Sequence, residues 1–82
     1  MSQEMIELLR EDLRKKREDI EILQTTEDYL EVCLNLCGKY DQSAEERIRI
    51  RTAMRYNSSL RTIEEGRFVK LKTVLELYGG EE

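Results

Sequence analysis

The stretch Ser43–Tyr78, SAEERIRIRTAMRYNSSLRTIEEGRFVKLKTVLELY, decides the fold because no proline interrupts it. Its first four residues place a serine three positions before a glutamate, the pattern of a helix N-terminal capping box. The next break is Gly79-Gly80. We therefore predict a long helix over about 44–78, which at ~1.5 Å per residue spans roughly 50 Å. Such a helix must project from a small globule or pack along another chain.

Two positions inside this long helix favour helix formation less than their neighbours do. Asn57-Ser58-Ser59 are mediocre helix formers, and Gly66 costs about 1 kcal/mol relative to alanine in a helix interior. Either position is a candidate for a bend. One helix, straight or bent, is the simplest interpretation, and two helices divided near Asn57 are the alternative.

Two shorter helices are predicted upstream, over about 2–24 and 26–37. Ser2 is the candidate N-cap of the first helix, Thr25–Asp28 separates the two, and Gly38 is placed to end the second. The first helix carries a heptad seam at spacings of three and four residues, and almost all the residues between are charged. The seam consists of Ile6, Leu9, Leu13, Lys16, Ile20 and Leu23.

The second predicted helix is apolar nearly all round, with Glu31 and Asn35 as the exceptions. Such a helix belongs in the middle of a core. The fold class is therefore predicted as all-α: a three-helix arrangement in one domain, 1–78, packing into an oligomeric helical bundle. Residues 79–82 are expected to be a flexible tail or the start of a linker.

Composition argues against catalysis and against a cofactor or metal site. The chain has 82 residues, a net charge of -4 and no histidine, the commonest general base and transition-metal ligand. Cys33 and Cys37 share a helix face, and we interpret both as small buried hydrophobic residues rather than as metal ligands or a redox pair. No apolar run approaches the ~20 residues that span a bilayer, so a cytoplasmic protein is expected.

The end of the long helix is the predicted protein interface, because it is too apolar to be satisfied by the rest of this chain. Arg67 falls on this surface, where either Glu64 or an acid on another helix pairs with it, or its stem packs while its head reaches water. The predicted interface residues are Leu60, Ile63, Arg67, Phe68, Leu71, Val74, Leu75 and Tyr78.

A second candidate surface is basic. Arg47, Arg51 and Arg55 recur every four residues along the long helix. They either pair with the acid-rich first helix, contact a protein, or hold DNA phosphates. The run 14–17 is likewise interpreted as a solvated helix face, with a basic contact surface as the alternative.

Three stretches together resemble the helical domain of an archaeal GINS subunit, an accessory complex of the replicative helicase. They are IELLREDLRKKR at 6–17, TEDYLEV at 26–32 and YNSSLRTIEEGRFVKL at 56–71. Leu30, Ser58 and Leu71 depart from the family's usual aromatic, alanine and isoleucine. The family normally carries a second, smaller β-rich domain, and the residues Gly79-Gly80-Glu81-Glu82 are either the start of a severed linker toward it or a natural end.

The resemblance implies scaffolding without catalysis. It further implies a tetrameric assembly of related subunits through their long helices, and docking to the replicative helicase and a RecJ-like protein. The partners expected for the helices are therefore copies of this chain or related helical subunits, in a dimer or a tetramer. Two other classes stay open. One is a small viral or regulatory protein that inhibits a host factor by helix-in-groove contact. The other is a helical DNA-binding dimer that uses the arginine stripe.

Overall fold

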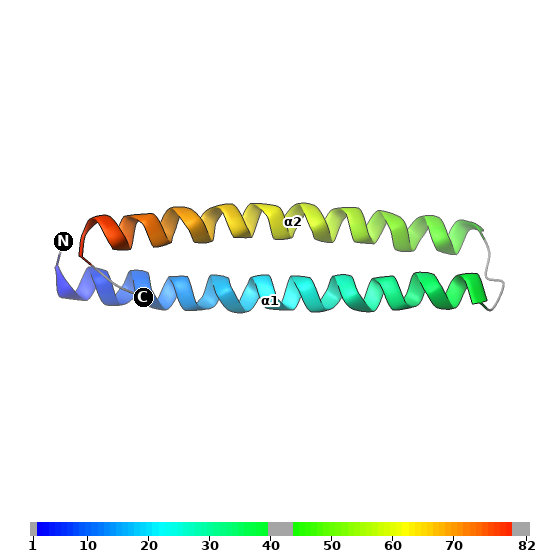
Figure 1. The fold of residues 1–82 in the computed structure, drawn as a ribbon, viewed down its shortest axis with the longest axis horizontal. Coiled ribbons are helices and arrows are strands. Elements are labelled where there is room, and N and C mark those ends of the chain that lie inside the picture. The colour runs from blue at the N-terminus through cyan, green and yellow to red at the C-terminus, as the bar shows by residue number, and fades with distance from the viewer. Residues whose placement is uncertain (1, 40–43, 80–82) are drawn as a thin grey trace.

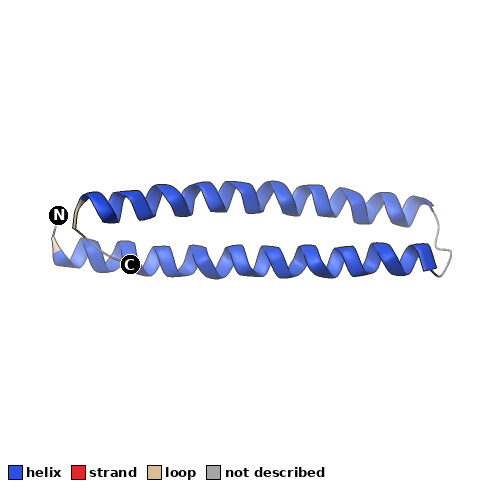
Figure 2. Cartoon of the chain, in the orientation of Figure 1, coloured by secondary structure: helices blue, strands red, loops and turns tan. Residues whose placement is uncertain are grey.

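The chain folds as an antiparallel pair of long helices. The computed structural model describes residues 2–39 and 44–79, in which α1 runs over Gln3–Lys39 and α2 over Ala44–Leu77. The two helices lie side by side along their whole length, with the N-terminus of α1 beside the C-terminus of α2 (Figure 1). Nearly every described residue is helical, and none forms a strand (Figure 2). The all-α class therefore fits, but the prediction of three helices is wrong.

The predicted break at Thr25–Asp28 does not occur, because the threonines there are accommodated inside α1. Thr25 Oγ1 donates to the carbonyl of Glu21 at 3.0 Å, and Thr26 Oγ1 donates to that of Ile22 at 2.8 Å. Hydroxyls bonded four residues back are satisfied within the helix and do not act as caps. The predicted helices 2–24 and 26–37 are therefore one.

The sequence predicts a cap at each end of α1, and the structure contains one of the two. Ser2 is the N-cap as predicted, since its Oγ accepts a hydrogen bond from the Met5 amide at 3.2 Å. Gly38 does not end the helix: it lies within α1, which continues to Lys39, and its φ is not positive. The predicted capping serine, Ser43, lies outside the described residues.

The long C-terminal helix is continuous, as the simplest interpretation had it. It begins at Ala44 and passes through both Asn57 and Gly66 without interruption. A Cβ added at Gly66 would meet no atom within 4 Å, so no close backbone approach explains this glycine. Past the helix, Gly79 has a φ of +78°, the left-handed conformation common after a helix C-terminus.

The two helices meet along a heptad seam that runs the full length of both. In α1 the seam continues the predicted spacing of three and four residues past Thr25 to Cys37. All its members are buried or half-buried: Ile6, Leu9, Leu13, Lys16, Ile20, Leu23, Glu27, Leu30, Leu34 and Cys37. The α2 members that are equally covered are Arg47, Ile50, Met54, Asn57, Arg61, Glu64, Phe68, Leu71 and Leu75.

Polar side chains interrupt this seam midway along the hairpin. Asn57 is buried and donates from Nδ2 to the Leu23 carbonyl at 2.7 Å. Nearby, Arg61 Nη1 lies 2.9 Å from Glu27 Oε2, although without the geometry of a hydrogen bond. We call Glu27, Asn57 and Arg61 the polar layer. These polar side chains replace apolar packing, and their contacts form in only one register of the two helices.

Three cross-helix contacts fix that register. Arg17 lies over the Phe68 ring at 5.4 Å, Leu23 accepts from Asn57, and Glu27 faces Arg61. Averaged over these pairs, residue i of α1 lies level with residue ~84 − i of α2, as expected for antiparallel helices of constant rise. The same rule orders every other pair along the hairpin.

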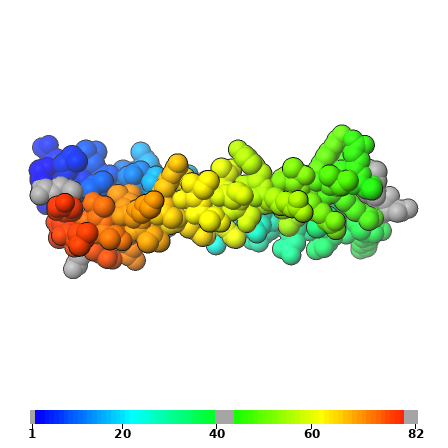
Figure 3. Space-filling model, turned by 90° about the horizontal axis from the view of Figure 1, so that it is seen from above, coloured from blue at the N-terminus to red at the C-terminus, as the bar shows by residue number. Residues whose placement is uncertain are grey.

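The result is a rod with a thin core rather than a globule. Its extents are 58 × 14 × 14 Å, and its radius of gyration is 17.9 Å, against ~12 Å for a compact domain of this length. The space-filling view shows the same narrow body from end to end (Figure 3). The buried hydrophobic residues among those described are Leu13, Cys37, Ile50 and Leu75.

Candidate interaction surface

Most of the large hydrophobic side chains that the hairpin exposes lie on one side of it, next to the seam. On α1 they recur at spacings of three and four that run parallel to the seam, about a quarter-turn away. The exposed members on α1 are Met5, Leu8, Ile22, Tyr29, Cys33 and Leu36. The corresponding members on α2, exposed or half-buried, are Ala53, Tyr56, Leu60, Ile63, Val74 and Leu77. We call these twelve residues the apolar face.

The two helices contribute to the same side of the hairpin. A groove between them is lined from α1 by Asp19 and Ile22, and from α2 by Leu60 and Arg67. A second depression, on α1 itself, is lined by Ile22, Thr26 and Tyr29 together with acidic neighbours. Antiparallel packing brings like heptad positions to one side, which explains why both apolar stripes border a common groove.

The opposite side of the seam is polar. On α1 the equivalent positions hold no large apolar side chain. They are Glu7, Arg10, Arg14, Arg17, Glu21, Gln24, Asp28, Glu31, Asn35 and Gly38. On α2 this side is also mostly polar, with Ile48 and Val69 as exceptions. We call this side the polar face. The hairpin as a whole is therefore amphipathic, because each helix carries an apolar stripe in addition to the one that packs against the other helix.

A charged band divides the apolar face into a longer and a shorter part. It consists of Asp12, Lys15, Asp19, Arg67 and Lys70. Arg67 Nη1 is paired with Glu64 Oε1 at 2.8 Å, and Asp12 lies 3.7 Å from Lys16 Nζ. No ion pair is recorded within residues 2–39 and 44–79 for the other three. The α1 part of the band is net negative, and the α2 part is positive.

The second predicted helix, 26–37, supplies half of the α1 members of the apolar face, namely Tyr29, Cys33 and Leu36. It was expected in the middle of a core, yet Tyr29 is 70% exposed and Val32 53% exposed. Only one helix packs against this segment, and it covers the seam residues Leu30, Leu34 and Cys37. The remaining apolar residues face outward, so the expectation of a central helix is wrong within the described chain.

The predicted interface on the long helix divides between the seam and the outside. Leu75 is buried, and Phe68 and Leu71 are half-buried against α1. Leu60, Val74 and Ile63 belong to the apolar face, where Ile63 is 51% exposed. Arg67 is exposed and pairs with Glu64, the first of the predicted alternatives, and Tyr78 is exposed beyond the end of α2.

The arginine stripe spreads around α2 and does not form one contact row. Arg47 lies on the seam, where its Nε is buried without a hydrogen-bond partner among the described residues. Arg51 and Arg55 are exposed and turn toward the polar face. Because four residues advance a helix by more than one turn, each step rotates the stripe away from the seam.

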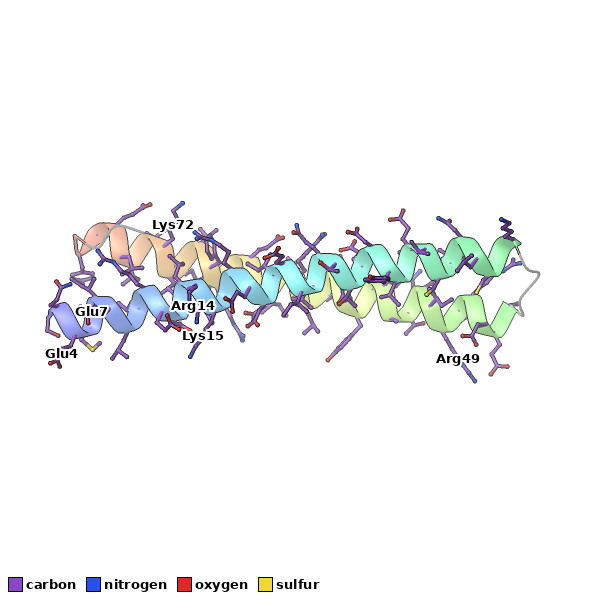
Figure 4. The ribbon with its side chains drawn as sticks, turned by 90° about the horizontal axis from the view of Figure 1, so that it is seen from below. Glu4, Glu7, Arg14, Lys15, Arg49 and Lys72 are labelled. Atoms are coloured by element: carbon purple, nitrogen blue, oxygen red, sulfur yellow. The ribbon has the colours of Figure 1, made fainter. Side chains whose placement is uncertain are left out.

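The basic run 14–17 is mostly engaged by its own helix. Arg14 forms ion pairs with both Glu11 and Glu18, and its hydrogen bond with Glu11 holds the pKa of that carboxyl below its ordinary value. Arg14 and Lys15 project from the first half of α1, far from Arg49 at the other end of the rod (Figure 4). A solvated face, as predicted, describes Arg14 and Lys15.

Residues that carry metal or thiol chemistry do not gather in one place. No group of three or more Cys, Asp or Glu side chains is positioned to hold a metal ion within the described ranges. Cys37 is a buried free thiol on the seam, which matches its predicted packing role. Cys33 is an exposed free thiol on the apolar face, which does not. No helix in the described part of the chain is long and apolar enough to cross a membrane.

Sequence reasoning missed the apolar face although the signal was present. Ile22, Tyr29 and Leu36 recur every seven residues, a second heptad stripe beside the first. Comparison of the chain with protein-family models, with curated proteins and with solved structures finds no match.

Proposed function

We propose that this protein is a non-catalytic helical assembly module that works by burying the apolar face against another protein chain. One observation carries the proposal: the hairpin has two apolar surfaces and covers only one of them. The seam is closed by the pairing of α1 with α2. The apolar face leaves Ile22, Tyr29, Tyr56 and Ile63 between 51% and 70% exposed.

The small core supports the same conclusion. Only four apolar side chains are buried among the described residues, and chains of this length seldom reach more than about 3–5 kcal/mol of stability from one core. Soluble monomers rarely expose large apolar patches, and the charged band leaves the longer part of the apolar face uninterrupted. Burial of the apolar face against a partner would add the hydrophobic stabilisation that the small core of the seam does not supply.

The identity of the partner distinguishes narrower forms of the proposal. A GINS-like role in DNA replication needs related helical subunits, the replicative helicase and a RecJ-like protein as partners. A regulatory inhibitor would seat the same face in a groove of a host protein. A cytoplasmic location belongs with either form. DNA binding is favoured least, because only Arg51 and Arg55 of the arginine stripe are exposed.

Photo-crosslinking in cells tests the general form. A photoreactive benzophenone side chain replaces Tyr29 on the apolar face or, as the matched control, its neighbour Asp28 on the polar face. The Tyr29 site should form a discrete adduct with one protein chain, identified by mass spectrometry, and the Asp28 site should not. Equal labelling from both sites, or no adduct from Tyr29, would reject the apolar face as the functional surface.

The protein found in the adduct then distinguishes the GINS-like role from the inhibitor role. Helicase subunits would support the GINS-like role, and an unrelated enzyme would support inhibition. A salt series on duplex DNA tests the remaining class, because phosphate contacts weaken steeply with rising salt. No binding at low salt removes it.

A further inference from the structure

We infer that the apolar face is covered by a second copy of this chain, in a four-helix bundle whose twofold axis runs parallel to the helices. This rests on the proposed function and adds to it the partner and the packing arrangement. In this arrangement α1 of each copy packs against α2 of the other copy. The C-terminal ends of both α1 helices lie at the same end of the bundle.

The available area suits such a dimer. The side of the rod that carries the apolar face and the charged band follows α1 from Met5 to Leu36, roughly 50 Å at the rise of an α-helix, across a rod 14 Å wide. That is on the order of 700 Å² of flat area, and side chains increase it, while a standard interface takes about 800 Å² from each partner. This side of the chain therefore offers enough surface to pack against one hairpin of its own size.

The axial level of the apolar residues matches in this arrangement. With the axis along the rod, residue i of one α1 lies level with residue ~84 − i of the other copy's α2, as it does within the hairpin. Ile22 then faces Ile63 of the other copy, and Tyr29 faces Tyr56. The shorter part of the face matches as well, with Leu8 level with Leu77.

The charged band matches in the same arrangement. Asp19 comes level with Arg67 of the other copy, and Asp12 with Lys70. The α1 part of the band is net negative and the α2 part is positive, so the two strips attract where they meet. Asp19 has no ion pair within the described residues of its own chain, which leaves its carboxylate available for this contact.

An axis across the rod fits poorly. It would set α1 against α1 of the other copy, with residue i level with about 42 − i when the hairpins overlap fully. Tyr29 would then lie level with the charged residues Asp12 and Lys15 of the opposite helix, and these two would be buried under apolar side chains. Sliding the hairpins until only the apolar parts overlap leaves much of each face uncovered.

Disulfide trapping of the full chain tests the arrangement. In a background with Cys33→Ala and Cys37→Ala, Tyr29→Cys is placed in one preparation and Tyr56→Cys in another. The preparations are unfolded in urea, refolded together and oxidised with glutathione disulfide. Each chain then carries a single cysteine, so no disulfide can form within one hairpin. A link between them therefore joins two chains.

The expected result is a covalent dimer in the mixture, in about half of the dimers because of random pairing, and little in either preparation by itself. Self-linking of Tyr29→Cys would indicate a transverse axis with the hairpins slid until their apolar parts overlap, and would overturn the arrangement. A monomer at micromolar concentration in sedimentation equilibrium would overturn the second copy as partner. A Tyr29 photo-adduct with a different protein would still leave the proposed function standing.

A pair of surface variants provides the control. Ile22→Glu with Ile63→Glu puts charge into the apolar face, and Asn35→Glu with Thr62→Glu puts the same charge on the polar face. The first pair should weaken dimerisation at least tenfold and the second should leave it unchanged. If the first pair unfolds the chain, the disulfide pattern of the otherwise unaltered face decides the question.

Discussion

The two halves of α1 use their apolar residues differently. In residues 3–20 the apolar side chains follow the seam, with Met5 and Leu8 as exceptions near the start, and charges occupy most other positions. In residues 22–37 they occupy both the seam and the apolar face. The first half is thus largely satisfied by α2, whereas the second half has an apolar surface that its own chain does not cover. An all-round apolar helix in a short chain therefore indicates a missing partner as readily as a central position in a core.

The sharpest way to break the first half is to remove its best-packed seam residue. Leu13 is 2% exposed on the seam, and Leu75 on the facing helix is 1% exposed. Leu13→Ala should lower the free energy of unfolding by about 2–3 kcal/mol, the lower part of the range for buried leucines, because a thin core relaxes around the cavity. Urea unfolding followed by circular dichroism measures it. Arg10→Ala, on the polar face one turn away, is the control and should change stability by under ~0.5 kcal/mol.

The second half should respond through association instead of through the hairpin. Tyr29→Glu places a charge at the centre of the apolar face, in a side chain that makes no seam contact. We expect the urea midpoint of the wild-type chain to rise with protein concentration, since a partner that binds only folded chain stabilises it by mass action. The variant should lose that dependence, a change of about 1.4 kcal/mol for each tenfold in affinity.

The matched control for that comparison is Glu31→Gln, which alters an exposed side chain on the polar face of the same segment. It should keep the concentration dependence. If Tyr29→Glu and the wild-type chain unfold alike at every concentration, the two halves of α1 do not differ in the way proposed.

The polar layer lies where the two halves meet, and replacing it should stabilise the hairpin. Asn57 is 7% exposed on the seam, and its side chain bonds a carbonyl that α1 can already satisfy within the helix. Asn57→Leu should raise the free energy of unfolding by about 1 kcal/mol, because leucine burial outweighs one neutral hydrogen bond. A decrease would show that the layer contributes stability as well as register. Asn35→Leu, at an exposed asparagine, should change stability little.

The sequence predicted the class and the first seam because both depend on local patterns. Spacing of three and four residues placed Ile6 to Leu23 on one face, and the capping pattern and lack of proline placed the long helix. The break at Thr25 could not be excluded locally, because a threonine followed by acids is compatible with a cap or with hydroxyls bonded four residues back. The neighbouring helix decided between them, by continuing the seam through Glu27 and Leu30.

The candidate surface was harder to predict for the same reason. Leu60 to Tyr78 contains both seam and apolar-face residues, and sequence cannot say which of two adjacent stripes meets α1. Phe68 and Leu75 pack against α1, whereas Ile63 is exposed on the apolar face. The choice depends on the partner stripe in α1, whose own second stripe at Ile22, Tyr29 and Leu36 looked like core. Because the packed stripe could not be identified on α1, it could not be identified on α2 either.

The smallest expected effect concerns the exposed ion pair between Glu11 and Arg14 in the first half of α1. The hydrogen bond and charge of Arg14 lower the pKa of Glu11 from its ordinary value of 4.5. A carboxyl whose folded pKa is depressed contributes stability above its unfolded pKa and loses it as pH falls through the folded value. Carboxyl NMR titration should find the Glu11 pKa below 4.5 in the wild-type chain and back near it in Arg14→Ala. Arg10→Ala removes a nearby arginine that is not the hydrogen-bond donor, so an equal rise there would mean that general charge, not the Arg14 contact, sets the shift. Both helical content and dimerisation should be unchanged in Arg14→Ala, because the pair lies outside the seam and the apolar face.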